Sequence, residues 1–296
     1  MAWCTDRRQL CFHWLSGRKA QSQRVIAALG LSLAPALFAF EQSGHQMVAQ
    51  LMIPYLNSGA QAEMQRLLGD NWQRSLVRNA ASVEAEMTRP SKPHLRALQF
   101  TLFDVDDEGF DPAKHCPNAV CSVGAILESE QVLQISSYSV REKREALQYL
   151  MHYTLELHIP MNSGLIRDEG GQKIFLDGES LQPINLSFIW NYDLYRRLDA
   201  HWFGFAQELY REMRAMEDLD SWVESDRPQD WAYETNRIAV EQAYPLAAEG
   251  RYSAELMNEG QKILELQLMK AAYRTAFLLN KMHPEPTELM TQEDSE

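Results

Sequence analysis

Residues 150–162 read LMHYTLELHIPMN, and this stretch decides both the fold and the chemistry expected of the chain. His152 and Glu156 stand four positions apart, so on a helix their side chains project from the same face. An imidazole nitrogen and a carboxylate oxygen are ligands that suit a zinc ion. The same spacing also occurs as an ordinary polar pair on a helix, so the stretch alone leaves both interpretations open.

The sequence on either side of this stretch has the periodicity of helices. Apolar residues recur every three or four positions in six segments, one of which contains most of the quoted stretch. Strand-like segments are few, and residues 170–178 are expected to form a short β-like hairpin arm or an extended loop. We therefore predict an all-α fold with a single compact domain. The six helical segments are residues 45–68, 72–87, 141–157, 195–216, 231–244 and 255–282.

The N-terminal segment has the pattern of a signal peptide. Residues 1–39 carry five basic side chains followed by the apolar run VIAALGLSLAPALFA, and Ala39 is a suitable small residue for cleavage. The apolar run is too short and too interrupted by proline for a stable transmembrane span. An uncleaved membrane anchor or a misassigned start are the alternatives. We expect an exported protein, periplasmic or secreted, without a membrane span after processing.

The charge of the chain limits its partners. The 296 residues carry a net charge of −13, and removal of residues 1–39, with five basic residues and one acidic residue, changes it to −17. A field of that sign repels phosphate backbones, so bulk electrostatics do not hold nucleic acid here. After cleavage, the helical domain is expected over residues 40–283, followed by a polar acidic tail at 284–296.

Two cysteines remain outside the leader. Cys116 and Cys121 are spaced to close a tight loop, and an exported protein reaches an oxidising compartment. We therefore predict a disulfide between them. A zinc knuckle is excluded because no second pair of cysteines or histidines stands at a matching spacing.

The order of motifs resembles a known family. The segments FEQSGH, CPNAVCSVGAI, ALQYLMHYTLELHIPMN, DEGGQKIFLDGESLQPINLSFIWNYDL, WAYETNRIAVEQAYP and ILELQLMKAAYRTAFLLNKM follow one another from residue 40 to residue 282. They resemble the single-strand-specific zinc-dependent nucleases, which share their all-α fold with zinc-dependent phospholipase C. The resemblance implies a helical fold of that type and hydrolysis of phosphodiester bonds at a cluster of three zinc ions.

The resemblance also implies which residues bind metal. One site would use the amine and carbonyl of Phe40, the side chain of His45 and a bridging Glu156. Part of a second site would come from Glu84, His152 and the same Glu156. Glu84 is preferred over Glu86 because it keeps the family's spacing to the downstream segment LQF, although the local motif is poor. The implied metal-binding residues are Phe40, His45, Glu84, His152 and Glu156.

Four positions depart from the family pattern in the same direction. Gln99, Asn162 and Ser187 stand where the family has histidine, and Asn191 stands where it has aspartate. Neutral amides and hydroxyls bind zinc poorly, so fewer than three zinc ions are expected and the chain could hold none. Whether another side chain replaces a lost ligand stays open; the candidates are His94, His115, His158 and Asp168.

The function therefore has several interpretations. The first is an exported nuclease-like protein with a depleted metal site that acts on single-stranded DNA, RNA or nucleotides. The alternative is a catalytically inactive homologue that binds an unknown protein or ligand. A lipid phosphodiester hydrolase is a further alternative, because the phospholipase relatives share the fold. Whether the chain is an enzyme is not decided by its sequence.

Overall fold

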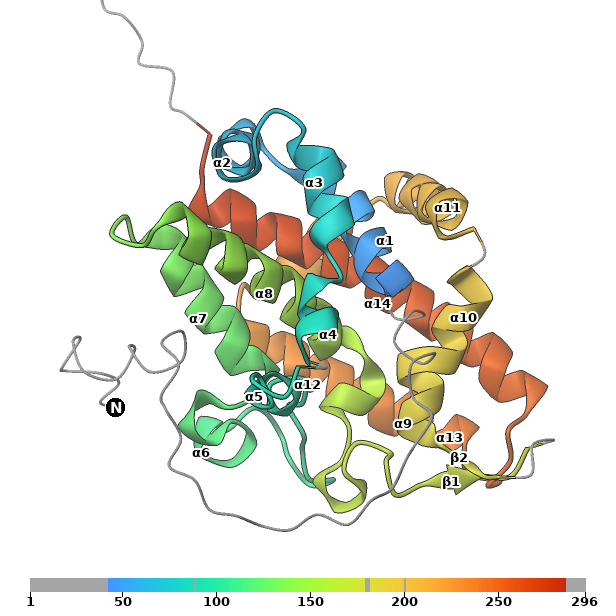
Figure 1. Ribbon diagram of the computed structural model, residues 1–296. Coiled ribbons are helices and arrows are strands. Elements are labelled where there is room, and N and C mark those ends of the chain that lie inside the picture. Colours follow the sequence, from blue (N-terminus) through green and yellow to red (C-terminus); the bar gives the residue numbers. More distant parts are fainter. Residues whose placement is uncertain (1–41, 88, 179–181, 200, 286–296) are drawn as a thin grey trace, which may run out of the picture. The chain divides into compact units, whose positions relative to one another are not determined.

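The computed structural model describes residues 42–87, 89–178, 182–199 and 201–285, all within one compact unit (Figure 1). The expected signal peptide at 1–39, Phe40 and most of the acidic tail lie outside these residues. Helices dominate and the only sheet within the described ranges has two short strands, which confirms the all-α prediction. The helices are α1 (Gln42–Met52), α2 (Ser58–Leu68), α3 (Trp72–Asn79), α4 (Ser82–Met87), α5 (His94–Ala97), α6 (Pro112–His115), α7 (Ser122–Gln134), α8 (Val140–His158), α9 (Leu186–Phe188), α10 (Leu194–Asp199), α11 (Trp202–Ala215), α12 (Pro228–Ile238), α13 (Tyr244–Leu246) and α14 (Ala254–Met282); the strands are β1 (Phe175–Leu176) and β2 (Ile184–Asn185).

Helix α8 is the helix around which the others pack. It starts at a capping box, in which the Ser139 side chain accepts from the amide of Glu142 and the Glu142 carboxylate accepts from the amide of Ser139. Its second half, residues 150–158, is buried on every side. Helices α1, α7, α12 and α14 all contact α8, and Figure 1 shows it running between α7 and α14. The quoted stretch is therefore core.

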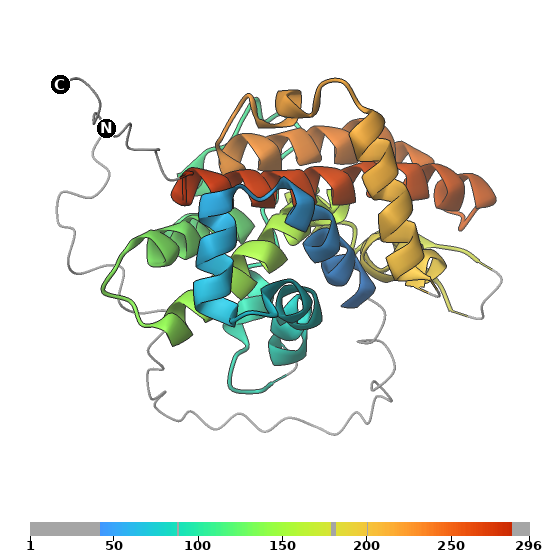
Figure 2. The ribbon, with the colours of Figure 1, turned by 90° about the horizontal axis from the view of Figure 1, so that it is seen from above.

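Helix α14, with 29 residues, is the longest helix in the part of the chain that the structure describes. It carries a broad buried stripe and packs against α1 and α8, and Figure 2 shows α1 lying against it. Because α1 contacts both long helices, its side chains are brought next to the second half of α8. Among the helices that can be described, none is long and apolar enough to cross a membrane.

Several predicted helices are interrupted. The segment 45–68 is divided by a turn of 3-10 helix at Ile53–Tyr55, where Pro54 cannot donate the next helical hydrogen bond. Asn57 then caps α2 by accepting from the amide of Ala60. Segment 72–87 is divided between α3 and α4, and segment 231–244 contains a π-helix at Ala239–Ala243.

Helix α7 was not among the predicted helices. Eight of its 13 residues are buried, including Ser122, Gly124 and Ser129. A helix with small and polar residues in the core does not show a clear apolar stripe, so its periodicity is hard to detect.

Residues 170–178, expected to be a short hairpin arm or an extended loop, contain strand β1 of a two-stranded hairpin. Strands β1 and β2 pair antiparallel, with Phe175 opposite Asn185. The turn that precedes β1 passes close to the end of α8: a Cβ at Gly170, where φ is +66°, would lie 2.3 Å from the carbonyl oxygen of Met161. Only glycine accepts both the positive φ and this approach.

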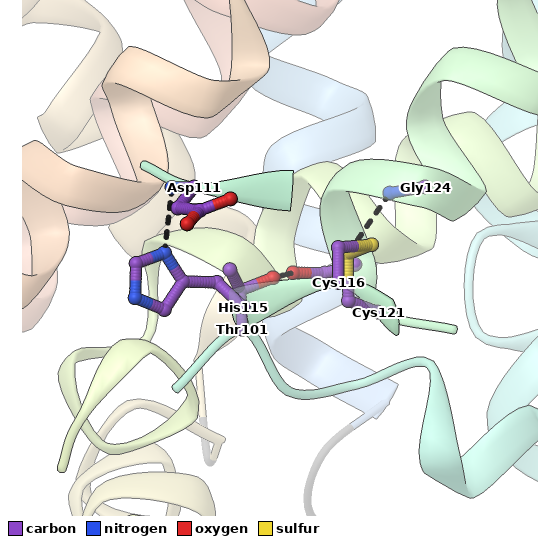
Figure 3. Close-up of a disulfide and its surroundings, with 7 residues drawn as sticks. Thr101, Asp111, His115, Cys116, Cys121 and Gly124 are labelled. Carbon is purple, nitrogen blue, oxygen red and sulfur yellow. Dashed lines mark hydrogen bonds between the residues drawn. A yellow bond between two sulfur atoms is a disulfide. The ribbon is translucent and has the colours of Figure 1, made fainter. Parts of the chain in front are cut away.

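The predicted disulfide between Cys116 and Cys121 is confirmed (Figure 3). Cys121 also caps α7, because its sulfur accepts from the amide of Gly124 at 3.2 Å. Next to the cap, the hydroxyls of Thr101 and Ser122 lie 2.6 Å apart. The amide of Thr101 in turn donates to the carbonyl of Asn162 at 2.9 Å, so the disulfide loop supports the segment that follows α8.

Candidate metal centre

Four potential metal ligands from three helices meet beside the second half of α8. They are His45 from α1, Glu84 from α4, and His152 and Glu156 from α8. One ligand atom of each lies within 4.8 Å of the others, and the four residues are at most 4% exposed. Residues separated by more than a hundred positions are thereby joined into one group, which we call the metal group.

The nitrogen atoms of the metal group converge on one carboxylate oxygen. Nε2 of His45 lies 3.5 Å and Nε2 of His152 lies 3.7 Å from Oε1 of Glu156, and the two rings are stacked with centroids 4.5 Å apart. These separations are too long for good hydrogen bonds. None of the three atoms has a hydrogen-bond partner among the described residues. Buried polar atoms without partners are costly, and a cation between them would satisfy all three.

The protonation of His152 suits metal binding. Complete burial lowers its pKa well below the usual value, and the neighbouring His45 lowers it further. The imidazole is therefore neutral at pH 7, and the neutral ring is the form that binds metals. A neutral His152 does not form an ion pair with Glu156.

The two candidate carboxylates of α4, Glu84 and Glu86, lie in different surroundings. Glu84 is buried and belongs to the metal group. Glu86 lies two residues further along α4 and forms an ion pair with Lys92. Nζ of Lys92 also lies 3.1 Å from Oε1 of Glu145. The two carboxylates of α4 therefore face different surroundings, and only Glu84 faces the histidines.

The second oxygen of Glu156 is held by side-chain amides. Oε2 accepts from Nδ2 of Asn162 at 2.7 Å and from Nε2 of Gln99 at 3.3 Å. Both residues occupy positions where the family resemblance implied a histidine ligand. The two oxygens of one carboxylate thus differ: Oε1 faces the histidines and Oε2 faces hydrogen-bond donors.

The amides continue away from Glu156 as a network. Nδ2 of Asn191 lies 3.3 Å from Oδ1 of Asn162, 2.9 Å from the carbonyl of Ser187 and 3.3 Å from its hydroxyl. Asn191 lies on a π-helix, Ile189–Asp193, a form that is frequent at functional sites. Gln99, Asn162, Ser187 and Asn191 together are the amide network. The sequence identified these four positions as departures from the family pattern, but it did not show that two of them donate hydrogen bonds to Glu156. A sign of this network in the sequence was that all four changes are to neutral side chains that form hydrogen bonds.

None of the candidate replacement ligands belongs to the metal group. His158 faces the other way: its Nδ1 lies 2.6 Å from the carbonyl of Thr154 and its Nε2 lies 2.9 Å from Nη1 of Arg274. Burial and then the charge of Arg274 lower the pKa of His158 to about 3.

The other three candidates also lie outside the metal group. Nε2 of His115 lies 2.8 Å from Oδ2 of Asp107, and Oδ1 of Asp168 accepts from the hydroxyl of Tyr244 at 2.7 Å. His94 is in α5, outside the group. Phe40 lies outside the described residues.

Comparisons with known proteins show which family the chain is similar to. A family model described as S1/P1 Nuclease matches residues 40–283. The chain is 22% identical to Nuclease S1 of Aspergillus oryzae over 287 residues, which covers 88% of the chain and 98% of that protein. It is 24% identical to Endonuclease 3 of Arabidopsis thaliana, over 81% of the chain and 87% of that protein, and 22% identical to Nuclease P1 of Penicillium citrinum, over 81% and 96%.

Proposed function

Because this chain belongs to the S1/P1 nuclease family, we propose that it is an exported nuclease-like protein whose metal group binds one zinc ion and does not hydrolyse phosphodiester bonds. Family membership supports the nuclease-like scaffold. The chemistry of the donors supports the single ion, and the amide network argues against the hydrolytic cluster.

The residues that would hold the ion are His45, Glu84, His152 and Glu156. Two imidazoles and two carboxylates complete a four-coordinate set of the kind that zinc prefers. All four side chains are buried, and a closed set of four protein ligands is typical of structural rather than catalytic zinc sites. Burial keeps His152 neutral and water away from its nitrogen atoms.

One observation carries the argument against hydrolysis: Oε2 of Glu156 accepts hydrogen bonds from Asn162 and Gln99. An oxygen held by two N–H donors is a poor bridge to a second cation. Zinc, when bound in a hydrolytic site, activates water and neutralises charge on the phosphate. The amide network carries no formal charge, so it supplies no cation in place of the metal ions that neutralise the charge on the phosphate in a hydrolytic cluster.

The two hydrolytic interpretations, a nuclease and a lipid phosphodiester hydrolase, are alternatives to this proposal. Hydrolysis of single-stranded DNA or RNA with one ion would require water to reach the metal group. Hydrolysis of a lipid phosphodiester is favoured by no feature of the described residues. Export is supported by the disulfide, since such bonds persist in oxidising compartments.

The experiment measures zinc content and hydrolysis together. Purified protein is loaded with zinc, desalted and analysed for metal, and the same sample is incubated with single-stranded DNA and added zinc. We expect one zinc ion per chain and no cleavage. Three ions per chain, or cleavage that a chelator stops, would overturn the proposal, and no bound zinc would overturn its metal part.

Matched histidine variants test which residues hold the ion. His45→Ala removes one ligand and is expected to lower the zinc content to near zero. His94→Ala removes a histidine outside the metal group and is expected to leave one ion bound. N-terminal sequencing of the mature protein tests export: a chain that begins at residue 1 would contradict cleavage after Ala39.

A further inference from the structure

A hollow lies where several helices begin or end, far along the chain from the ligands of the metal group. Its volume is about 730 Å³, which is within the size range of small-molecule pockets. Its lining comes from α2, the ends of α7 and α14, the turn after α7 and the start of α8. Figure 1 shows the end of α14 between α2 and the turn that joins α7 to α8. The hollow shares no residue with the metal group or the amide network.

Positive charge predominates in this lining, so we call it the basic hollow. Arg66, Lys143 and Lys281 line it, whereas Glu63 is the one carboxylate among the described residues that do so. Asp226, which forms an ion pair with Lys281, lies outside the lining. The whole chain carries a net charge of −13, so three cations around one hollow are a local exception. A concave surface lined by one sign of charge raises the local concentration of ions of the opposite sign.

Lys143 is buried without an anionic partner. The residue is 8% exposed, and its Nζ donates to the carbonyl oxygen of Leu133 at 2.5 Å. Among the described residues it forms no ion pair with a carboxylate. A buried charge costs free energy unless an opposite charge or several hydrogen bonds compensate it. One carbonyl group supplies only part of this compensation, so an anion in the basic hollow would stabilise Lys143.

The charges of Arg66 and Lys143 act on the same groups of the lining. Burial raises the pKa of Glu63, but the hydrogen bond and charge of Arg66 and the charges of His283 and Lys143 outweigh this effect and lower the pKa. Burial lowers the pKa of His283; Glu63 opposes this effect, whereas Lys143 and Arg66 add to it. The positive potentials of Arg66 and Lys143 therefore overlap at the basic hollow.

Two of the cations are accessible and keep unused N–H donors. The side chains of Arg66 and Lys281 are 49% and 51% exposed. Arg66 donates to the two oxygens of Glu63 through Nε and Nη2, at 2.6 Å each, which leaves three of its five N–H groups for another acceptor. Nζ of Lys281 donates to Asp226, and an ammonium group has three N–H donors. A phosphate monoester has several terminal oxygens that accept such bonds, and hydrogen bonds between ionised groups are the strong ones.

The other walls of the basic hollow are mostly polar. Gln134, Ser136 and Tyr138 contribute a carboxamide and two hydroxyl groups to the lining, beside the apolar side chains of Leu133 and Met282. Hydroxyl and amide groups form hydrogen bonds with the hydroxyls of a sugar. A long acyl chain would find little apolar surface there.

We propose that the basic hollow binds a small hydrophilic phosphate monoester, such as a sugar phosphate. The phosphate accepts hydrogen bonds from Arg66 and Lys281, and its negative charge compensates that of Lys143. The side chains of Gln134, Ser136 and Tyr138 contact the rest of the ligand. The site is separate from the metal group, so the proposal does not depend on whether zinc binds.

The test compares probes with and without phosphate. Glucose 6-phosphate, inorganic phosphate and glucose are each titrated into the purified full-length protein at low salt, with and without bound zinc. Binding is followed by chemical-shift changes in NMR spectra of the backbone amides. We expect saturable binding of glucose 6-phosphate with a Kd on the order of 1 mM, weaker binding of inorganic phosphate and none of glucose. Added salt is expected to weaken the binding, since it screens exposed charges.

Variants that remove a cation tie the binding to the basic hollow. Lys281→Gln removes an accessible cation and is expected to weaken binding of glucose 6-phosphate at least about tenfold. Lys262→Gln is the matched control, because Lys262 also lies on α14 and pairs with a carboxylate, Glu259, but is outside the lining. Lys143→Gln removes the buried charge while keeping a donor for Leu133, and a similar loss is expected.

A further variant is expected to strengthen binding. Glu63→Gln removes the one lining carboxylate and frees Arg66 from its ion pair, so binding of glucose 6-phosphate is expected to tighten by about threefold. A variant that merely perturbed the fold would not bind the ligand more tightly. Weaker binding by Glu63→Gln would contradict the proposal.

Vesicles separate a soluble ligand from a lipid headgroup, which could carry the same phosphate. Sedimentation with vesicles of phosphatidic acid or of phosphatidylcholine is expected to recover equal, small amounts of protein. Recovery with phosphatidic acid, together with no binding of glucose 6-phosphate, would overturn the soluble ligand in favour of a lipid. Equal binding of glucose and glucose 6-phosphate, binding that requires zinc, or binding unchanged in Lys281→Gln would overturn the site itself. If Lys143→Gln does not fold, the Lys281→Gln and Glu63→Gln results decide.

Discussion

Nδ2 of Asn162 donates to Oε2 of Glu156 over 2.7 Å, and both side chains are at most 1% exposed. A hydrogen bond to a buried carboxylate is charge-assisted and stronger than one between neutral groups. The bond holds one oxygen of Glu156 away from the histidines and leaves the other oxygen directed toward them. In the proposed function, this division of one carboxylate leaves only Oε1 of Glu156 available to a metal ion.

The first prediction concerns Gln99. Gln99→His replaces a donor to Glu156 by a nitrogen that can bind zinc, and we expect zinc to bind at least about tenfold more tightly. The measurement is competition for zinc against a chelator of known affinity. Gln99→Ala is the control, since it removes the same hydrogen bond without supplying a ligand. Equal affinity of the two variants would contradict the prediction.

The second prediction concerns metal-linked stability. Saturating zinc at a hundred times its Kd stabilises a protein by about 2.7 kcal/mol, which for a domain of this size raises Tm by about 5–10 °C. We expect this rise for the wild-type protein and its reversal by a chelator. Glu156→Gln replaces a negatively charged ligand by a neutral amide, so zinc is expected to bind weakly and the zinc-dependent rise in Tm is expected to disappear. Thermal unfolding with zinc and with chelator measures both effects.

A neighbouring carboxylate provides the control for that experiment. Glu86→Gln removes a charge from α4 next to Glu84, but Glu86 pairs with Lys92 and not with the histidines. Its zinc-dependent rise in Tm is expected to equal that of the wild-type protein. A loss of the rise in this variant would show that the effect of Glu156→Gln is general and not due to a lost ligand.

The third prediction concerns pH. Burial raises the pKa of Glu130 on α7 to about 7; Lys281 opposes this rise and Asp226 adds to it. The folded protein thus binds this proton more tightly than the unfolded chain, so the carboxyl contributes less stability as pH rises from about 4.3 to about 7. Glu130→Gln is therefore expected to raise the free energy of unfolding at pH 8 by about 1 kcal/mol, after a discount for partial exposure, and by less at pH 5.

Urea unfolding at the two pH values measures this difference. Glu142→Gln is the control, and its effect on stability is expected to have the opposite dependence on pH, because the hydrogen bonds from Ser139 lower the pKa of Glu142. A carboxyl with a lowered folded pKa contributes stability that is present at neutral pH and lost as pH falls. That variant is expected to be destabilised at pH 8 and closer to the wild-type protein in acid. A pH-independent effect of Glu130→Gln would refute the assignment of its pKa.

The fourth prediction concerns the disulfide. The bond between Cys116 and Cys121 closes a loop with a sequence separation of 5, so its loss is expected to cost about 2 kcal/mol. Replacing both residues by serine keeps an oxygen acceptor at position 121 for the cap of α7. Replacing both by alanine removes the cap as well and is expected to cost about 1 kcal/mol more. Chemical denaturation of the two double variants measures the difference, and equal stabilities would contradict a capping role for position 121.

Much of the fold could be predicted from the apolar periodicity of single segments of the sequence. The segments that became α8 and α14 show an apolar periodicity that agrees with the structure within one or two residues. The interruptions at Pro54 and at the π-helix Ala239–Ala243 were not predicted, because they depend on local hydrogen bonding that a periodic pattern does not register. Helix α7 was missed since much of its buried surface consists of small and polar residues.

The sequence by itself determined an all-α chain with a disulfide, the likeness to zinc-dependent nucleases, and the pair at His152 and Glu156. Those features follow from spacing within single helices and loops and from the order of motifs along the chain. Only the tertiary structure decided that His45 and Glu84 meet this pair, and that Asn162 and Gln99 bind Glu156. Each of these contacts joins side chains from separate segments of the chain, and such contacts are set by how the segments pack around α8.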